Sequence, residues 1–175
     1  MGSEKKKRNI IIIILIILIL LCLSVTVWAL FFRDSGGDII TPDYPPQGTE
    51  QNQKPIEDDN SEKLESPEGG GAINVTYGTD ATASIKEGTV SVYYANPKAS
   101  NQNVAILITI DDLVVAKSDL ITPGNMVTEL KFEENAKSKL TEGGYNAQLV
   151  VRAYDPSSGE KAMIDTKGEI TLTVK

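Results

Sequence analysis

The sequence predicts an all-β fold, a β-sandwich of about seven strands, preceded by one transmembrane helix and a disordered linker. Three observations lead to this prediction. Residues 10–32 are almost entirely apolar and carry no charge. Residues 33–71 are rich in proline, glycine and acidic side chains. From residue 72 onward apolar and polar residues alternate, which is the two-residue period of strands with one buried face.

The apolar run at residues 10–32 has the length of a membrane-spanning helix. At ~1.5 Å per residue it spans ~34 Å, enough to cross a hydrocarbon core of ~30 Å. Residues 5–8 are all basic, whereas only Arg33 follows the run before Asp34. Because basic residues stay on the cytoplasmic side, we expect residues 1–9 in the cytoplasm and everything after residue 32 outside. The predicted location is the cell membrane, with a single pass.

Two other interpretations of this run remain open. A cleaved signal peptide has an apolar region of ~7–15 residues and a small-residue cleavage site, which Val27-Trp28-Ala29 matches poorly. A lipoprotein signal would place a small residue before the modified cysteine, but Leu21 precedes Cys22. We therefore expect an uncleaved signal-anchor helix.

The segment at residues 33–71 is predicted to be a disordered linker. It contains five prolines and ten acidic side chains, and its aliphatic residues are few: Ile39, Ile40, Ile56 and Leu64. So little apolar surface does not offset the entropy lost on ordering. We expect a tether that holds the following domain off the membrane. A recruitment motif in the acidic residues 57–59 is the alternative.

Residues 72–175 are predicted to form the extracytoplasmic β-sandwich domain. A turn with proline and then glycine at its centre is expected at Pro123-Gly124, and one or two helical turns at residues 133–140. The number and spacing of the strands are typical of a sandwich. The expected strands are residues 73–77, 90–94, 102–110, 113–116, 126–132, 145–154 and 170–174.

One short motif refines the fold prediction. The segment from Leu140 to Tyr145, with Gly143 and Gly144 inside it, leads directly into an alternating strand. It resembles the tyrosine corner of immunoglobulin-like and fibronectin type III-like domains, in which a tyrosine hydroxyl bonds to nearby backbone. The resemblance implies that role for Tyr145. The domain has no cysteine pair and no core tryptophan, so it resembles the cysteine-free form found in bacterial membrane-anchored surface proteins, and this implies no specific function.

The residues available for chemistry are few. The chain has no histidine and a single cysteine, which excludes Ser-His and Cys-His catalysis and zinc sites built on these residues. Asp111 and Asp112 form a candidate glycosidase-like pair, and Asp155 with Glu160 a candidate calcium site, but turn chemistry explains both. We expect no enzyme activity, no cofactor, no metal and, because the chain is acidic, no nucleic-acid partner.

The predicted function is that of a non-enzymatic, membrane-tethered surface module that presents its domain for protein or envelope binding. The alternative is a structural accessory subunit of an envelope complex, such as a secretion, conjugation or division apparatus. If alternate residues of two central strands point inward, the opposite face carries Leu107, Val150, Arg152 and Tyr154. Arginine and tyrosine are enriched at binding hot spots, so this is the candidate partner face. The alternative is that they are ordinary surface residues of a sheet.

Overall fold

The computed structural model describes residues 12, 14–24, 45–46, 48–66 and 70–175. The chain divides into two units, Met1–Ile40 and Thr41–Lys175. In the first unit residues 14–24 are helical, inside the predicted membrane segment. Within the described ranges no helix reaches the length and apolar character needed to cross a bilayer. The predicted span at residues 10–32 and the basic residues 1–9 extend outside these ranges.

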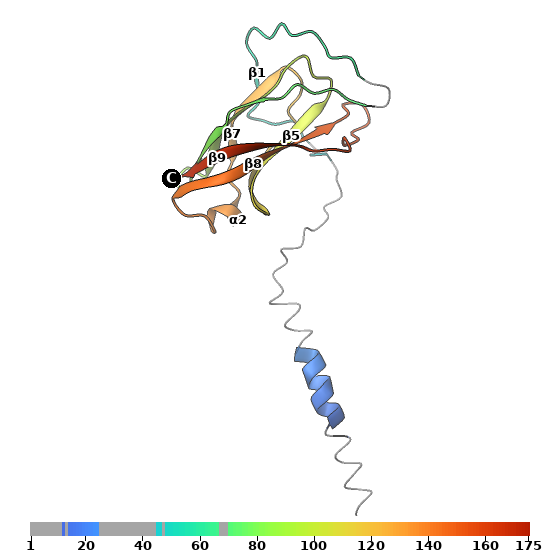
Figure 1. The fold of residues 1–175 in the computed structure, drawn as a ribbon, viewed down its shortest axis with the longest axis vertical. Coiled ribbons are helices and arrows are strands. Elements are labelled where there is room, and N and C mark those ends of the chain that lie inside the picture. Colours follow the sequence, from blue (N-terminus) through green and yellow to red (C-terminus); the bar gives the residue numbers. More distant parts are fainter. Residues whose placement is uncertain (1–11, 13, 25–44, 47, 67–69) are drawn as a thin grey trace, which may run out of the picture. The chain divides into compact units, whose positions relative to one another are not determined.

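The second unit is predominantly β (Figure 1). Its described residues form one sheet of nine strands and a single helical turn, α2 (Glu134–Lys137). The strands are β1 (Lys54–Pro55), β2 (Thr76–Tyr77), β3 (Asp80–Ser84), β4 (Thr89–Asn96), β5 (Asn103–Ile110), β6 (Leu113–Lys117), β7 (Asn125–Lys131), β8 (Gly143–Tyr154) and β9 (Thr166–Val174).

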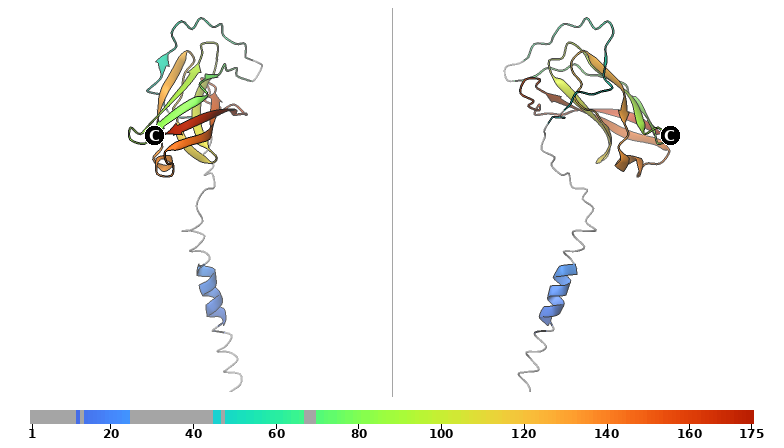
Figure 2. Two further views of the ribbon diagram at one scale, coloured as in Figure 1. Left: turned by 60° about the vertical axis from the view of Figure 1, so that its left-hand side comes forward. Right: turned by 180° about the vertical axis from the view of Figure 1, so that it is seen from behind.

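The sheet curls until its two ends meet. The strand order is β1-β7-β4-β3-β9-β8-β5-β6, with β2 paired to β4 off this path. Every pair is antiparallel except β3 and β9. Ala116 of β6 bridges to Phe132, just after β7, and the Glu133 N–H donates to the Val115 carbonyl at 2.9 Å. The two views in Figure 2 show the strands wrapping around a common interior.

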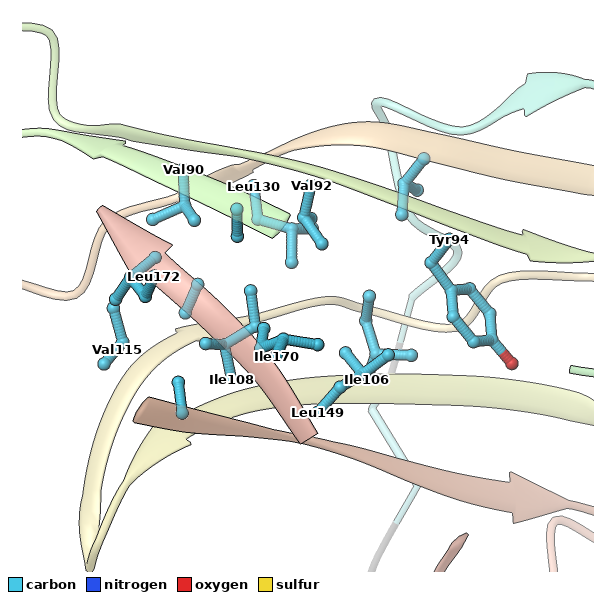
Figure 3. Close-up of a cluster of buried hydrophobic side chains, with 14 of the residues drawn as sticks. Val90, Val92, Tyr94, Ile106, Ile108, Val115, Leu130, Leu149, Ile170 and Leu172 are labelled. Atoms are coloured by element: carbon cyan, nitrogen blue, oxygen red, sulfur yellow. The ribbon is translucent and has the colours of Figure 1, made fainter. Parts of the chain in front are cut away.

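The interior is filled by the inward side chains of this curled sheet. Figure 3 shows side chains of β4 and β7 meeting those of β5, β8 and β9 across the core. The alternation in the sequence produces this arrangement, since every second residue of a strand points to the same face. Buried members of the cluster include Val90, Val92, Tyr94, Ile106, Ile108, Leu130, Leu149, Ile170 and Leu172.

The strand expected at residues 73–77 differs from the structure. Only Thr76 and Tyr77 pair there, and the chain then continues into β3, which the alternation of large apolar residues does not predict. The inward positions of β3 are Ala81 and Ala83, both buried. Small side chains suit β3 because it is the strand that joins the two facing halves of the sheet, through β4 on one side and β9 on the other.

The predicted disordered linker also differs from the structure. Residues 48–66, here called the strap, lie against the domain, and β1 within them pairs with β7. The prediction considered only apolar burial, of which the strap has little. The strap is instead held by hydrogen bonds to backbone groups that β7 and the connecting loops leave unpaired. The boundary expected at residue 71 therefore does not mark where the folded unit begins.

The buried Tyr94 provides a test of the core. Its side chain is fully buried, and its hydroxyl has no hydrogen-bond partner among the described residues. Burial accordingly raises the pKa of Tyr94 far above its ordinary value. We predict that Tyr94→Phe raises the free energy of unfolding by about 1 kcal/mol. The substitution removes a buried hydroxyl whose loss of hydration is not offset by a hydrogen bond. Denaturant unfolding would measure this, and a loss of more than about 1 kcal/mol would show that the hydroxyl is bonded.

Candidate binding groove

A groove of about 770 Å³ lies on the face of β5 and β8 that points away from the core. Its floor is formed by Ala105 and Leu107 of β5 and by Arg152 and Tyr154 of β8, and Ala105 stands opposite Arg152 in the register of the two strands. The walls come from residues before β1 and from the ends of β6 and β7: Pro46, Glu50, Gln51, Asn52, Lys117, Ser118, Asp119, Lys131 and Glu133. The site thus combines a partly apolar floor with a charged rim.

Glu50 fixes the strap at one wall of the groove. Its N–H donates to the Leu120 carbonyl at 2.8 Å, and the Leu120 N–H donates to the Gly48 carbonyl at 3.0 Å. The Glu50 carboxylate accepts the Asp119 N–H at 2.9 Å and the Asn52 N–H at 3.1 Å. Both carboxylate oxygens therefore serve backbone donors, so Glu50 is a positioning group for the wall.

The strap continues along the turn before β7. The Thr122 N–H donates to the side-chain oxygen of Gln53 at 3.1 Å, and the Ile56 N–H donates to the Gly124 carbonyl at 2.9 Å. Gly124 has φ of +86° at the expected Pro-Gly turn, a value that glycine adopts without strain. The turn thus presents its carbonyl to the strap and confirms the expected proline-glycine geometry.

Asp59 anchors the far end of the strap. Its carboxylate accepts the Lys98 N–H at 2.6 Å, and its carbonyl accepts the Lys98 ammonium at 3.1 Å. The hydrogen bond from the Lys98 backbone, followed by that from the Ser61 hydroxyl, lowers the pKa of Asp59 below its ordinary value. Of the acidic residues 57–59, Asp59 is thus engaged with the domain, whereas Glu57 and Asp58 are exposed.

Ion pairs shape the charged sides of the groove. The Lys117 ammonium lies 3.6 Å from the Glu133 carboxylate, across the junction of β6 with the segment after β7. The Arg152 guanidinium lies 3.3 Å from the Asp165 carboxylate, which also pairs with Lys161 at 3.0 Å. Arg152 is consequently held at the floor by a neighbouring loop.

Part of the predicted partner face forms the floor of this groove, namely Leu107, Arg152 and Tyr154. Leu107, Val150, Arg152 and Tyr154 all lie outside the core cluster. Two of the four, Val150 and Tyr154, are nevertheless covered and are only 7% and 3% exposed. Tyr154 lies beside the wall built by the strap, and Val150 lies in register between Leu107 and Lys167, whose longer side chains share its face. Binding by this face remains a prediction.

Tyr145 lies at the start of β8, where its hydroxyl reaches back by four residues. It donates to the Thr141 carbonyl at 2.9 Å and accepts the Thr141 N–H at 3.2 Å. Tyr145 and Leu140 are both partly buried against the core. The hydroxyl therefore closes the loop between α2 and β8 onto the first residues of the strand.

The acidic side chains considered as chemical groups lie in turns. Asp111 has φ of +50° in the turn between β5 and β6, and Asp112 follows it. The Asp155 carboxylate accepts the N–H groups of Ser158 and Ser157, both at 2.8 Å, and these bonds lower the pKa of Asp155. In the part of the chain that the structure describes, no three acidic or cysteine side chains gather closely enough to hold a metal ion. The Asp155 carboxylate therefore serves as a hydrogen-bond acceptor for the backbone of its own turn.

Comparison with known proteins gives little further information. No family model matches the sequence, and no curated protein matches it. Among solved structures the chain is similar to AggA, the major subunit of aggregative adherence fimbriae type I from Escherichia coli. The identity is 12%, the alignment covers 66% of this chain and 100% of that one, and the TM-score is 0.29. A TM-score this low establishes no shared fold.

We predict that Tyr145→Phe lowers the free energy of unfolding by about 0.5–1.5 kcal/mol, because the exposed loop then loses the hydroxyl bonds to Thr141. The measurement is denaturant unfolding of the full chain in detergent, with the circular dichroism of the domain as the signal. Tyr94→Phe is the matched control, since it deletes the same atom where no bond exists. An unchanged free energy of unfolding for Tyr145→Phe would mean that the Tyr145 hydroxyl contributes nothing.

The contact between Asp59 and the Lys98 backbone should weaken in acid. A carboxyl whose pKa is lowered in the folded state stabilises that state above its unfolded pKa and stops doing so as the pH falls through the folded pKa. We therefore expect the Lys98 amide resonance to titrate below pH 3.8, the ordinary value for this carboxyl. Asp59→Asn should abolish that titration. A Lys98 amide that titrates at or above the ordinary value would contradict the assigned bond.

Proposed function

We propose that this chain is a non-enzymatic surface protein. A membrane helix would hold its β-rich domain outside the cell, where the groove above β5 and β8 would bind a protein or an envelope component. The alternative, already raised by the sequence, is a structural accessory subunit of an envelope complex. In that case the membrane helix would also contact other subunits of the complex.

The observation that carries membrane anchoring is the helix at residues 14–24. Its large aliphatic side chains are exposed all round, for example Ile16 at 51%, Leu20 at 60% and Leu21 at 61%. A helix that packs on a soluble domain has one apolar stripe, whereas a helix that is apolar on every side needs apolar surroundings. A lipid bilayer supplies them, and the basic residues 5–8 set the direction of insertion.

The strand order supports an immunoglobulin-like arrangement for the domain. β3, β4 and β7 would form one sheet and β9, β8, β5 and β6 the other, and the parallel β3–β9 pair would join them at one edge. In this arrangement β8 is the strand that carries the tyrosine of the corner motif. The fold does not assign the function by itself.

The composition of the groove supports the recognition of a protein segment. Leu107 offers apolar surface, Arg152 offers a planar cation, and the rim carries charges of both signs. Interfaces draw most of their energy from a few aromatic, arginine and apolar side chains in a partly enclosed setting. The groove is walled by residues of the strap and by the ends of β6 and β7, so it suits side chains that project from a partner surface.

Anchoring and orientation are tested on intact cells that make the full chain. We expect external protease to remove the domain while the membrane fraction retains the N-terminal fragment. Protection of the domain until the cells are broken would contradict this orientation. Release of the full chain by high salt or carbonate would contradict the membrane helix itself.

The binding proposal is tested with a partner that co-purifies with the full chain, by measuring the affinity of that partner for variants of the groove. Leu107→Ser and Arg152→Ala should each weaken binding by more than ~1 kcal/mol and leave the melting temperature nearly unchanged. Glu129→Ala, on the exposed face of β7, is the matched control and should have no effect. Full binding by the double variant would remove the groove from the proposal. Exchange of residues 10–32 for an unrelated membrane helix separates the alternative, because only an accessory subunit depends on helix identity.

A further inference from the structure

The loop between β8 and β9 carries the most exposed apolar side chains of the second unit. Met163 is 100% exposed and Ile164 is 82% exposed, side by side on the segment that returns to β9, and this pair is here called the tip. Among the described residues of this unit, the other exposed large apolar side chains, Leu64 and Tyr93, reach only 42% and 41%. Two adjacent apolar side chains that are left in water are unfavourable, because burial of apolar surface is favourable.

The stem of this loop is firmly built. The Asp155 N–H donates to the Glu160 carbonyl and the Gly159 N–H to the Asp155 carbonyl, both at 2.8 Å. Lys161 bridges to Tyr154, and the Ala162 N–H donates to the Ala153 carbonyl at 2.8 Å. These bonds close the turn at residues 155–160 just before the tip, and Thr166 pairs with Val151 just after it. The tip therefore protrudes from a hairpin that is ordered on both sides of it.

Ion pairs lie close to the tip in the sequence. Asp165 pairs with Lys161 at 3.0 Å and with Arg152 at 3.3 Å. The Asp155 carboxylate is engaged by two backbone N–H groups. The residues that line the same hollow as the tip are mostly polar, charged or glycine: Ser66, Gly70, Gly71, Gln102, Asp155, Ser158, Glu160, Lys161 and Ala162. The tip is thus a small apolar point surrounded by polar groups.

We infer that Met163 and Ile164 insert into the surface of a lipid bilayer. A protein interface buries ~800 Å² on each partner, far more apolar surface than two side chains offer. A bilayer accepts a small apolar point with a polar surround, because the side chains enter the acyl boundary while the polar groups remain at headgroup level. The inference rests on the proposed membrane anchor, which supplies the lipid surface.

The length of the chain permits this contact. Residues 33–44 lie between the apolar run and Pro45, which lies near Gly159 of the domain, and twelve residues reach at most about 40 Å. A domain of this size has a radius of gyration of only about 14 Å. Any part of its surface, the tip included, can therefore touch the bilayer that holds the anchor. Tethering also raises the local concentration of lipid, so that two side chains suffice for a weak contact.

The test uses the full chain in nanodiscs with brominated lipids, which quench fluorophores that enter the bilayer. An environment-sensitive label is attached at Met163→Cys or, as the control in the same loop, at Ser157→Cys, both in a Cys22→Ser background. We expect the label at 163 to shift to the blue and lose most of its emission, and the label at 157 to do neither. Ile164→Asp should restore the emission of the label at 163.

Trp28, the only tryptophan, reports separately on the anchor because it lies in the apolar run. Quenching of Trp28 without quenching at 163 would overturn lipid insertion by the tip and leave the anchor standing. Quenching at neither position would overturn both proposals. Equal quenching at 157 and 163 would also overturn the inference, since it would indicate general adsorption of the loop.

Discussion

The structure depends on the burial of one face of every long strand. In β4, β5 and β8 the inward residues alternate with outward ones, and the inward set fills the space enclosed by the curled sheet. Side chains such as Ile106, Leu149 and Leu172 are fully buried. Because the side-chain period is two, a shift of one residue in any pairing would turn such a row outward. The apolar interior therefore fixes the register, and the register places the groove and the loops.

The strap depends on a different kind of interaction. Its contacts with the domain are largely hydrogen bonds to backbone groups, made by Glu50, Gln53, Ile56 and Asp59. Such bonds contribute only about 0.5–1.5 kcal/mol each, and the strap adds little apolar burial to them. It closes one wall of the groove but is held less strongly than the sheet. Access to the groove and the stability of the core are therefore separate properties of the molecule.

The strands with large buried side chains could be predicted from the sequence, but β1, β3 and the ordering of the strap could not. Alternation located β4 to β9 because large apolar residues mark their inward faces. It missed β3, whose buried positions are alanines, and β1, which consists of Lys54 and Pro55 and buries nothing. It also missed the ordering of the strap, because a search for apolar burial does not detect acidic and amide side chains that bind backbone donors.

The candidate site was predictable to a similar extent. The period of two placed Leu107, Val150, Arg152 and Tyr154 on one face, but it could not indicate which neighbours cover that face. Tyr154 is buried, and it lines the same groove as Pro46 and residues 50–52, about a hundred positions earlier in the chain. The hydrogen bonds of Tyr145 were easier to predict, since they run to Thr141, only four residues away. Local contacts leave a local signal in a sequence, whereas contacts distant in sequence do not.

The central claim is that a sheet with an independent apolar interior carries a strap held by polar bonds. Native-state hydrogen exchange of the full chain tests it most directly, through the amides of Glu50 and Ile56 compared with those of Ile106 and Leu149. The account predicts intermediate protection for the strap amides, which exchange by local opening well before the strand amides do. Protection of the strap amides equal to that of the strands would show that the strap is part of the cooperative core. No protection at all would show that it does not dock, and either result would contradict the account.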